Sequence, residues 1–205
     1  MCIRDRSFQI REFEDEGIIL AGVNLPPSLT ARSLPFVGDE LGVAMQDYPH
    51  MVTAGVLVED TGAGRVRAVG REGVVVTYPM NDHDTVEVTR AVMLLGGALF
   101  ESGAHTVHLP FAGRDALHGI DDLRRASHIP VRSSEIPLFT VHLMGTARLG
   151  TDPGWAVCDP FGAVHDTVGL TVADASLFPG PVGVNPMLTI MALATRAAEG
   201  MIDRW

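Results

Sequence analysis

A single long helix pattern near the middle of the sequence most constrains how this chain can fold. Asp84 and Glu87 have the spacing of an acidic capping box, in which a carboxylate accepts from free backbone amides and the later residue reaches back. Gly103 is an expected terminator because glycine adopts the left-handed conformation without steric cost. Gly96 and Gly97 inside the helix each cost about 1 kcal/mol relative to alanine. We therefore expect a helix that ends just before Gly103 and packs its glycines closely against another segment.

Short β-rich runs separated by Gly and Asp turn residues come before this helix. We expect a buried strand at residues 17–22, a short helix at 39–46, and an antiparallel meander at 52–59, 65–69 and 73–78. After the helix we expect a loop with a short amphipathic segment at 119–126, strands at 136–142 and 170–173, and a last helix from Pro186. The sequence therefore predicts a mixed α/β fold.

Composition excludes several classes of protein. With 205 residues, 46% of them hydrophobic and 20% charged, the chain can bury a sizeable core and is not disordered. A net charge of −10 and the lack of a Lys/Arg run argue against a nucleic-acid surface. The longest apolar run, residues 91–100, is too short to cross a bilayer. Cys2 and Cys158 form neither a disulfide framework nor a metal pattern.

The first seven residues are charged and match no natural start, so we interpret residues 1–7 as a non-native leader and begin the fold at Phe8. This opening has no apolar core of the kind that a signal peptide requires. On that basis the expected location is the cytoplasm.

Two patterns suggest chemistry that other features of the sequence argue against. Gly62 and Gly64 begin like a dinucleotide fingerprint, but the third glycine is missing and a strand follows, so we predict a turn between strands. His105 and His108 raise the alternative of a metallohydrolase. Residues three apart in a strand face opposite sides, and no HExxH pair supports them. We predict no metal site.

Three C-terminal segments carry stronger candidates. His142 begins the run HLMGTARLG and enters a glycine turn. Asp174 ends the expected strand in LTVADASLFP, and Asn185 in GVNPMLTIMA is positioned to cap a helix whose first residue is Pro186. Taken singly, each has a structural explanation: a hydrogen-bonded core histidine, an Asx turn and a plain helix cap.

Taken together and in this order, with DPFGAVHD at residues 159–166 between them, these segments closely resemble the C-terminal signature of the glucose–methanol–choline oxidoreductases. The resemblance covers residues 142–198. Leu149, Ala163 and Asp166 depart from the usual pattern, and none of them occupies a presumed catalytic position. A weaker likeness upstream, around residues 56–66, points to the long-chain alcohol oxidase branch.

The resemblance implies an FAD-dependent enzyme that oxidises an alcohol to a carbonyl by hydride transfer to flavin N5. It implies that residues 8–134 are part of a substrate-binding domain with an antiparallel sheet. Residues 135–205 then supply a strand and a helix that complete an FAD-binding domain. By motif match, His142 is the base and Asn185 is the hydrogen-bond partner of the substrate. The residues expected near FAD are Asp174, Ala175, Asn185, Pro186 and Met187.

The expected last helix is apolar on one side, and we predict that its methionines pack in the core. The Gly-rich segment that binds the ADP half of FAD in this family has no counterpart in the chain, so we expect a missing N-terminal partner segment and a product that is inactive by itself. The alternative is a non-catalytic α/β binding module, in which His142 and Asn185 need not line one pocket. The sequence leaves open the substrate and the choice between oxidase and dehydrogenase.

Overall fold

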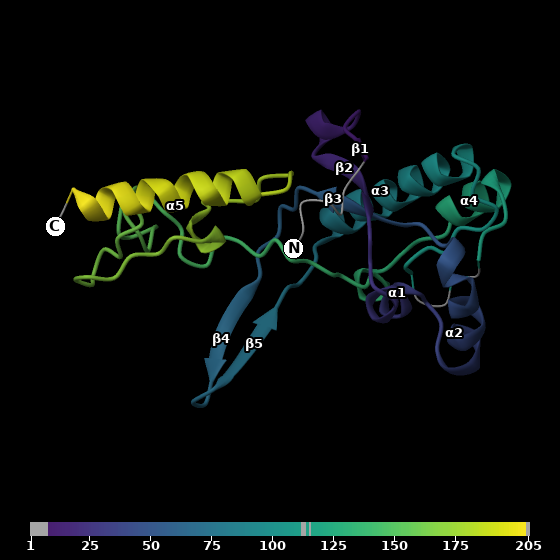
Figure 1. The fold of residues 1–205 in the computed structure, drawn as a ribbon, viewed down its shortest axis with the longest axis horizontal. Coiled ribbons are helices and arrows are strands. Elements are labelled where there is room, and N and C mark those ends of the chain that lie inside the picture. The colour runs from purple at the N-terminus through teal and green to yellow at the C-terminus, as the bar shows by residue number, and fades with distance from the viewer. Residues whose placement is uncertain (1–7, 112–113, 115, 204–205) are drawn as a thin grey trace. The chain divides into compact units, whose positions relative to one another are not determined.

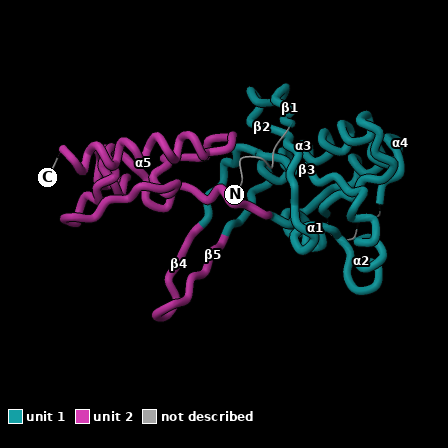
Figure 2. The backbone as a smooth tube through the Cα atoms, in the orientation of Figure 1, with its two compact units in different colours: residues 1–64, 78–138 teal, residues 65–77, 139–205 magenta. Residues whose placement is uncertain are grey.

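The computed structural model describes residues 8–111, 114 and 116–203. The chain divides into two compact units (Figure 2). The first, here called the helix–sheet unit, comprises residues up to 64 and residues 78–138. The second, the C-terminal unit, comprises residues 65–77 and 139–205. The leader predicted at residues 1–7 lies outside the described residues.

The helix–sheet unit is built on a three-stranded antiparallel sheet in the order β1–β2–β3 (Figure 1). Its strands are β1 (Gln9–Ile10), β2 (Ile18–Val23) and β3 (Thr53–Val58). A 3₁₀ turn (Glu14–Glu16) joins the first two strands. The strand predicted at 17–22 is confirmed as β2, and its residues Ile18, Ile19 and Leu20 are fully buried. The segment is a run of apolar residues buried on both faces, and this is why so short a strand can be predicted from the sequence.

The predicted meander is confirmed in the antiparallel pairing of its last two strands and wrong in the pairing of its first. β3 pairs with β2 along its whole length, whereas β4 (Arg65–Val69) and β5 (Gly73–Thr77) form a separate two-stranded hairpin in the C-terminal unit. Every residue of these two strands is exposed. Strand propensity therefore identified the segments, but propensity carries no information about which strand pairs with which.

The central helix α3 (Asp82–Glu101) ends as predicted: Ser102 is its C-cap, and Gly103 follows with a φ of 97°. Its start differs from the predicted capping box. The N-cap is Asn81, whose side chain accepts from the backbone amide of Asp84 at 2.7 Å. Asp84 already lies in the first turn, and its carboxylate is used elsewhere. Asn satisfies a free helix amide as well as an acid does, so the sequence offered two caps three residues apart.

α3 packs on β2 and β3 and against α4 (Ile120–Ser127), the helix predicted at 119–126. The predicted close packing of its glycines is confirmed, because a Cβ added at Gly96 would lie 3.0 Å from Leu123 of α4. The principal core cluster forms around this contact and comprises Val92, Val107, Leu109, Phe111, Leu117, Leu123 and Ile136.

Short helices complete the helix–sheet unit. They are α1 (Pro27–Ser33), α2 (Gly38–Ala44) and two 3₁₀ segments, Met45–His50 and Ser133–Glu135. The helix predicted at 39–46 corresponds to α2. The segment 62–64 lies between β3 and β4 and forms no helix, as predicted for a turn rather than a dinucleotide fingerprint.

The C-terminal unit consists mainly of turns, a 3₁₀ segment (Ala175–Leu177) and the helix α5 (Met187–Ile202). The strand predicted at 136–142 does not form: Leu138, Phe139 and Val141 are exposed, and no ladder partner is found for them among the described residues. The segment predicted as a strand at 170–173 makes a single antiparallel bridge, between Thr171 and Ala163. Apolar alternation without a neighbouring strand does not make a sheet.

α5 buries a narrow face and exposes a second apolar one. Ala197 and Gly200 are its buried residues, whereas Leu188 and Ile202 are more than 70% exposed. The predicted core packing of the methionines is wrong in this chain, because Met187, Met191 and Met201 are also exposed. Helical periodicity identifies an apolar face, but it does not say whether that face has a partner.

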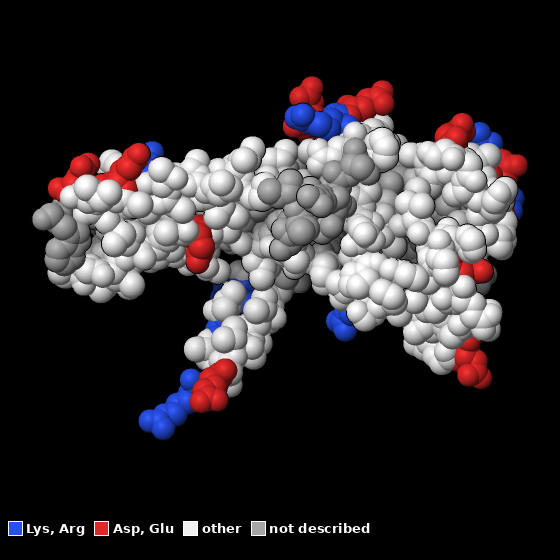
Figure 3. Space-filling view, in the orientation of Figure 1, with Lys and Arg blue, Asp and Glu red and all other residues white. Residues whose placement is uncertain are grey.

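The mixed α/β class is confirmed, with antiparallel sheets and five α-helices among the described residues. No helix in this part of the chain has the length and apolarity needed to cross a membrane. On the face shown in Figure 3, arginines lie in small separate groups and form no continuous patch.

Candidate functional site

The histidine motif and the Asp174 motif lie side by side in the C-terminal unit. Three backbone amides of the first motif donate to carbonyls of the 3₁₀ segment: Gly145 to Ala175 at 3.4 Å, Ala147 to Ser176 at 2.9 Å, and Leu149 to Leu177 at 3.0 Å. These alternating bonds resemble a short ladder and fix the register of the two motifs. Leu177 is buried beneath them, together with Phe178. Segments some 30 residues apart in the sequence thus become neighbours.

His142 is half-buried and enters this ladder from an irregular segment, not from the end of a strand. Its backbone amide donates to the hydroxyl of Thr140 at 3.0 Å. The chain then turns at Gly145, which has a φ of 81° and whose missing Cβ would lie 3.4 Å from the Phe178 carbonyl. A side chain at residue 145 would therefore be strained and crowded at once. This glycine sets where the histidine stands relative to the ladder.

Asp174 is an exposed carboxylate that begins the 3₁₀ segment as its N-cap. One of its oxygens accepts from the Ser176 amide at 2.8 Å and from the Ser176 hydroxyl at 2.5 Å. These bonds favour the anion and hold the pKa of the carboxyl below its ordinary value. The Asx turn considered from the sequence is therefore present, and the carboxylate remains open to solvent.

The DPFGAVHD motif forms a tight turn that connects the ladder to α5. The Asp159 carboxylate accepts from the amides of Phe161 and Ala163, and Gly162 follows a left-handed path with a φ of 80°. A Cβ at Gly162 would lie 2.4 Å from the Val172 carbonyl and 3.3 Å from Ala197 of α5. Since backbone fills the space where a side chain would stand, this motif serves packing rather than chemistry.

α5 begins one residue later than predicted. Pro186 is its N-cap, and its carbonyl accepts from the Ile190 amide at 2.8 Å, so Asn185 precedes the helix and the prediction that it caps the helix is wrong. Proline has a fixed φ suited to helix starts, which allows it to take either position. Pro186 makes no side-chain capping bond, and the first turn of α5 holds no acid. Asn185 and Pro186 are half-buried and buried, respectively, and Met187 is exposed.

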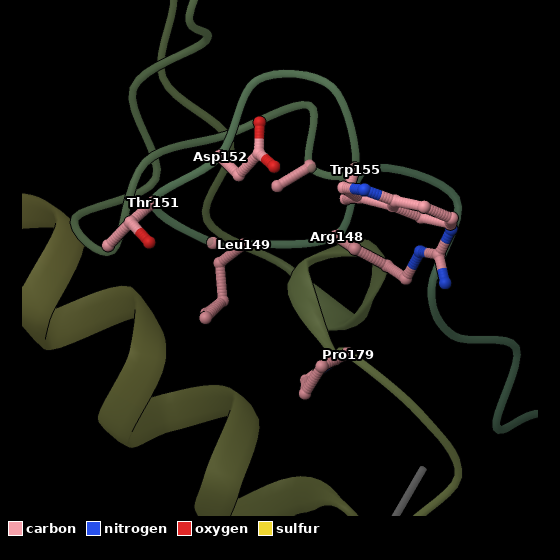
Figure 4. Close-up of a pocket in the computed structure, with 8 residues that line it drawn as sticks. Arg148, Leu149, Thr151, Asp152, Trp155 and Pro179 are labelled. Atoms are coloured by element: carbon pink, nitrogen blue, oxygen red, sulfur yellow. The ribbon is translucent and has the colours of Figure 1, made fainter.

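The structure thus brings the ladder residues, including Ala175, together with Asp174, and ties them through the Asp159 turn to α5. The joint use of His142 and Asn185 by one substrate stays a prediction. Sequence reasoning missed a pocket of about 240 Å³ formed by the turn after the histidine motif (Figure 4). Pro179 lies across this pocket from Asp152, with Arg148 and Trp155 to one side. The predicted site residues are not in its lining.

Comparison with known proteins decides the family. The profile described as GMC oxidoreductase matches residues 64–194. A GMC-type oxidoreductase of Mycobacterium tuberculosis, itself described as uncharacterized, is 33% identical over 204 residues, which is 97% of this chain and 32% of the relative. The chain belongs to the GMC oxidoreductase family.

Two further relatives of this GMC chain have names that state a reaction. A long-chain-alcohol oxidase of Arabidopsis thaliana is 25% identical over 188 residues, 87% of this chain and 25% of the relative. The paromamine 6'-oxidase of Streptomyces fradiae is 45% identical over 60 residues, 29% of this chain and 11% of the relative. The chain spans about a third of the length of the first relatives it matches.

The two histidines of the HTVH run in the helix–sheet unit of the GMC chain differ: His105 is exposed, whereas His108 is half-buried and packed. His108 meets the Phe36 ring edge-on at 5.2 Å between centroids. Burial first, and then the neighbouring His118, lower the pKa of His108. Within the described residues no group of three or more His, Cys, Asp or Glu side chains could hold a metal ion.

Proposed function

We propose that this chain is the C-terminal part of an FAD-dependent alcohol oxidoreductase that converts a CH–OH group to a carbonyl. The observation that carries the proposal is the ladder that holds the His142 motif against Asp174 and Ala175 in the same unit as the start of α5. Relatives named as a long-chain-alcohol oxidase and a paromamine 6'-oxidase support the reaction class.

The chemistry of the available groups fits FAD. Asp174 is an ionised, exposed acceptor suited to the hydroxyls of a ribityl chain. The start of α5 carries partial positive charge and has no acidic residue in its first turn, which suits an anionic flavin edge beside Asn185, Pro186 and Met187. FAD, when bound, supplies the acceptor for the hydride that leaves the alcohol carbon.

His142 and Asn185 are proposed to handle the alcohol itself. Loss of hydride from carbon requires loss of the hydroxyl proton, and a neutral imidazole can accept that proton near pH 7. An amide cannot titrate, so Asn185 is assigned to hold the substrate oxygen by a hydrogen bond. The half-buried position of both residues is compatible with a site that is shielded yet reachable.

The rest of the parent protein is the proposed partner of this chain. Residues 8–134 are proposed to belong to the substrate-binding domain and residues 135–205 to complete the FAD site. Because the chain spans about a third of its relatives, we propose that an N-terminal segment supplies the pocket for the ADP half. The chain by itself is then expected to bind FAD weakly and to oxidise no alcohol. A purified yellow preparation of these 205 residues that oxidises alcohols would overturn this part.

The decisive experiment replaces His142 with alanine in the full protein expressed from its genomic locus. We expect kcat to fall by about 10²–10⁴-fold, because a positioned base contributes that much. The kcat/KM of the parent enzyme should decline as pH falls and the base becomes protonated, and this limb should disappear in the variant. Flavin absorbance measures whether FAD is retained.

His165→Ala is the matched control. His165 is a half-buried histidine of the same unit whose Nε2 lies 3.0 Å from the Gly150 carbonyl, which assigns it to packing. We expect His165→Ala to keep the acid limb of the pH profile. If it loses that limb as His142→Ala does, the assignment of the base is wrong. If His142→Ala keeps full activity, His142 is not the base, and the alternative of a non-catalytic binding module is favoured.

A further inference from the structure

A groove of about 580 Å³ lies between α3 and α4 in the helix–sheet unit. This volume falls within the range of pockets that bind small molecules. Its apolar lining includes Val86, Met93, Leu94, Leu123, Ile129 and Val131. No lining residue belongs to the site proposed above.

The hydroxyl groups that line the groove already donate their protons within the protein and cannot donate to a hydroxylated ligand. Thr85 donates its hydroxyl proton to the Asn81 carbonyl, and Thr89 donates to the Thr85 carbonyl, both at 2.7 Å. Ser127 donates to the Arg124 carbonyl at 2.8 Å. Because these hydroxyl protons are committed to the helices' own backbone, the three hydroxyls can only accept, and with its many apolar side chains the lining favours a hydrocarbon over a sugar.

Two arginines also line the groove, and they differ in how firmly they are held. Arg90 bonds Glu16 at 2.5 Å and Glu87 at 3.4 Å. Arg124 bonds Asp121 at 2.9 Å, and both of those side chains are more than 70% exposed. An exposed pair of this kind contributes about 0–1 kcal/mol. Arg124 can therefore exchange Asp121 for the carboxylate of a ligand at little cost.

We propose that this groove binds an unbranched alkyl carboxylate. The hydrocarbon chain lies along Val86, Met93 and Leu123, and the carboxylate is bound by Arg124. The proposal goes beyond the oxidation proposed above, because it concerns other residues and needs neither FAD nor an alcohol.

Calorimetric titration of the 205-residue chain with dodecanoate, below its micelle concentration, tests the ligand class. We expect one saturable site. Octanoate, which is four methylenes shorter, should bind at least about tenfold more weakly because each buried methylene contributes up to about 0.8 kcal/mol. Dodecyltrimethylammonium should also bind more weakly, since it places a cation at Arg124. Non-saturable uptake, or equal binding of the cation, would overturn the proposal.

Three variants locate the site. Val86→Asp should weaken dodecanoate binding about tenfold or more, because it sets a charge against the hydrocarbon. Arg124→Glu should weaken it by up to about fivefold. Arg125→Glu is the matched control: Arg125 is the next residue of α4, is equally exposed at 72%, pairs with Asp122 and lies outside the lining. An equal loss in Arg124→Glu and Arg125→Glu, with helical content unchanged, would show that the groove is not the site.

Discussion

The two units of this chain are ordered by different kinds of interaction. The helix–sheet unit holds both apolar core clusters, one around Phe111 and Leu123 and one around Ile18 and Leu20. The C-terminal unit has fewer buried apolar side chains, and its turns are held by backbone hydrogen bonds, carboxylate-capped loops and glycines with positive φ. A core of large side chains tolerates small shifts, whereas a turn in which backbone touches backbone does not. The unit that carries the proposed chemistry is thus the more tightly specified one.

Gly162→Ala tests this difference most strongly. The substitution imposes a left-handed backbone on a residue with a Cβ and drives that Cβ into the Val172 carbonyl, 2.4 Å away. We expect a loss of about 3–4 kcal/mol in the C-terminal unit. Hydrogen exchange of the Val172 amide, which donates to the Gly162 carbonyl, measures it.

Gly169→Ala is the control for this prediction. Gly169 has nearly the same φ, 78°, but nothing lies within 4 Å of its added Cβ. It should therefore cost only about 1–2 kcal/mol, the price of the backbone conformation alone. Equal effects of the two substitutions would mean that close packing at Gly162 contributes nothing.

Asp84→Ala asks whether the helix–sheet unit also depends on a specific polar contact. The buried Asp84 carboxylate accepts from the amide and hydroxyl of Thr61, at 2.9 and 2.7 Å, and from the amide of Gly62 at 2.9 Å. Removing it leaves three donors without this acceptor, and we expect a loss of about 2–3 kcal/mol in the free energy of unfolding. Urea denaturation measures the loss. A loss below about 1 kcal/mol would indicate that water replaces the carboxylate.

The same residue predicts how stability depends on pH. Burial raises the pKa of Asp84, but the bonds from Thr61 and Gly62 outweigh burial, so its folded pKa lies below the ordinary value. A depressed carboxyl pKa contributes stability that is present above the unfolded pKa, about 3.9, and is lost as pH falls through the folded pKa. Asp84→Asn should flatten that acid decline in urea midpoints measured below about pH 4. An unchanged decline would assign it to other carboxylates.

Gly97→Ala and Gly96→Ala give the smallest expected effects and test the packing of α3. At Gly97 the nearest atom to an added Cβ is 3.9 Å away, so alanine should stabilise the helix by up to about 1 kcal/mol. At Gly96 the Leu123 methyl is 3.0 Å away, and its displacement should cancel most of that gain. The difference between the two urea midpoints, at constant m, reports the contact.

Much of the helix–sheet unit was predictable because its elements bury regular apolar patterns. β2, α3 and α4 follow from a short apolar run, a glycine terminator and an amphipathic segment. The cap at Asn81 was missed because Asn81 and Asp84 are both suitable N-caps within one turn of sequence. In the fold Asp84 accepts from Thr61, a residue distant in the sequence, and Asn81 caps the helix. The pairing of β3 was missed for a similar reason: β3 pairs with β2, a strand some 35 residues earlier in the sequence, whereas the hairpin of β4 and β5 was predicted.

For the candidate site, the sequence proposes residues but not their geometry, and the roles of those residues stay predictions. His142, Asp174 and Asn185 are predicted from the order of their motifs, and that order states nothing about backbone shape. The ladder between residues 145–149 and 175–177 depends on bonds across some 30 residues, so periodicity gives no sign of it. The strands expected at 136–142 and 170–173 failed because β-propensity measures how well a side chain fits a sheet, and here no sheet is present to fit.

The exposed hairpin of β4 and β5 affects how well the chain resists proteolysis. An isolated two-stranded ribbon is marginally stable in water, and this one is joined by only five residue pairs, with no side chain of its strands buried. It therefore opens easily into an extended segment of the kind that a protease cleaves. A cut between Val69 and Gly73 would leave the core around Phe111 and the ladder around Ala175 each covalently whole. The same cut would place Ile18 and Leu20 on a different fragment from Ala91, so limited digestion would divide the second core cluster into two pieces joined only by packing.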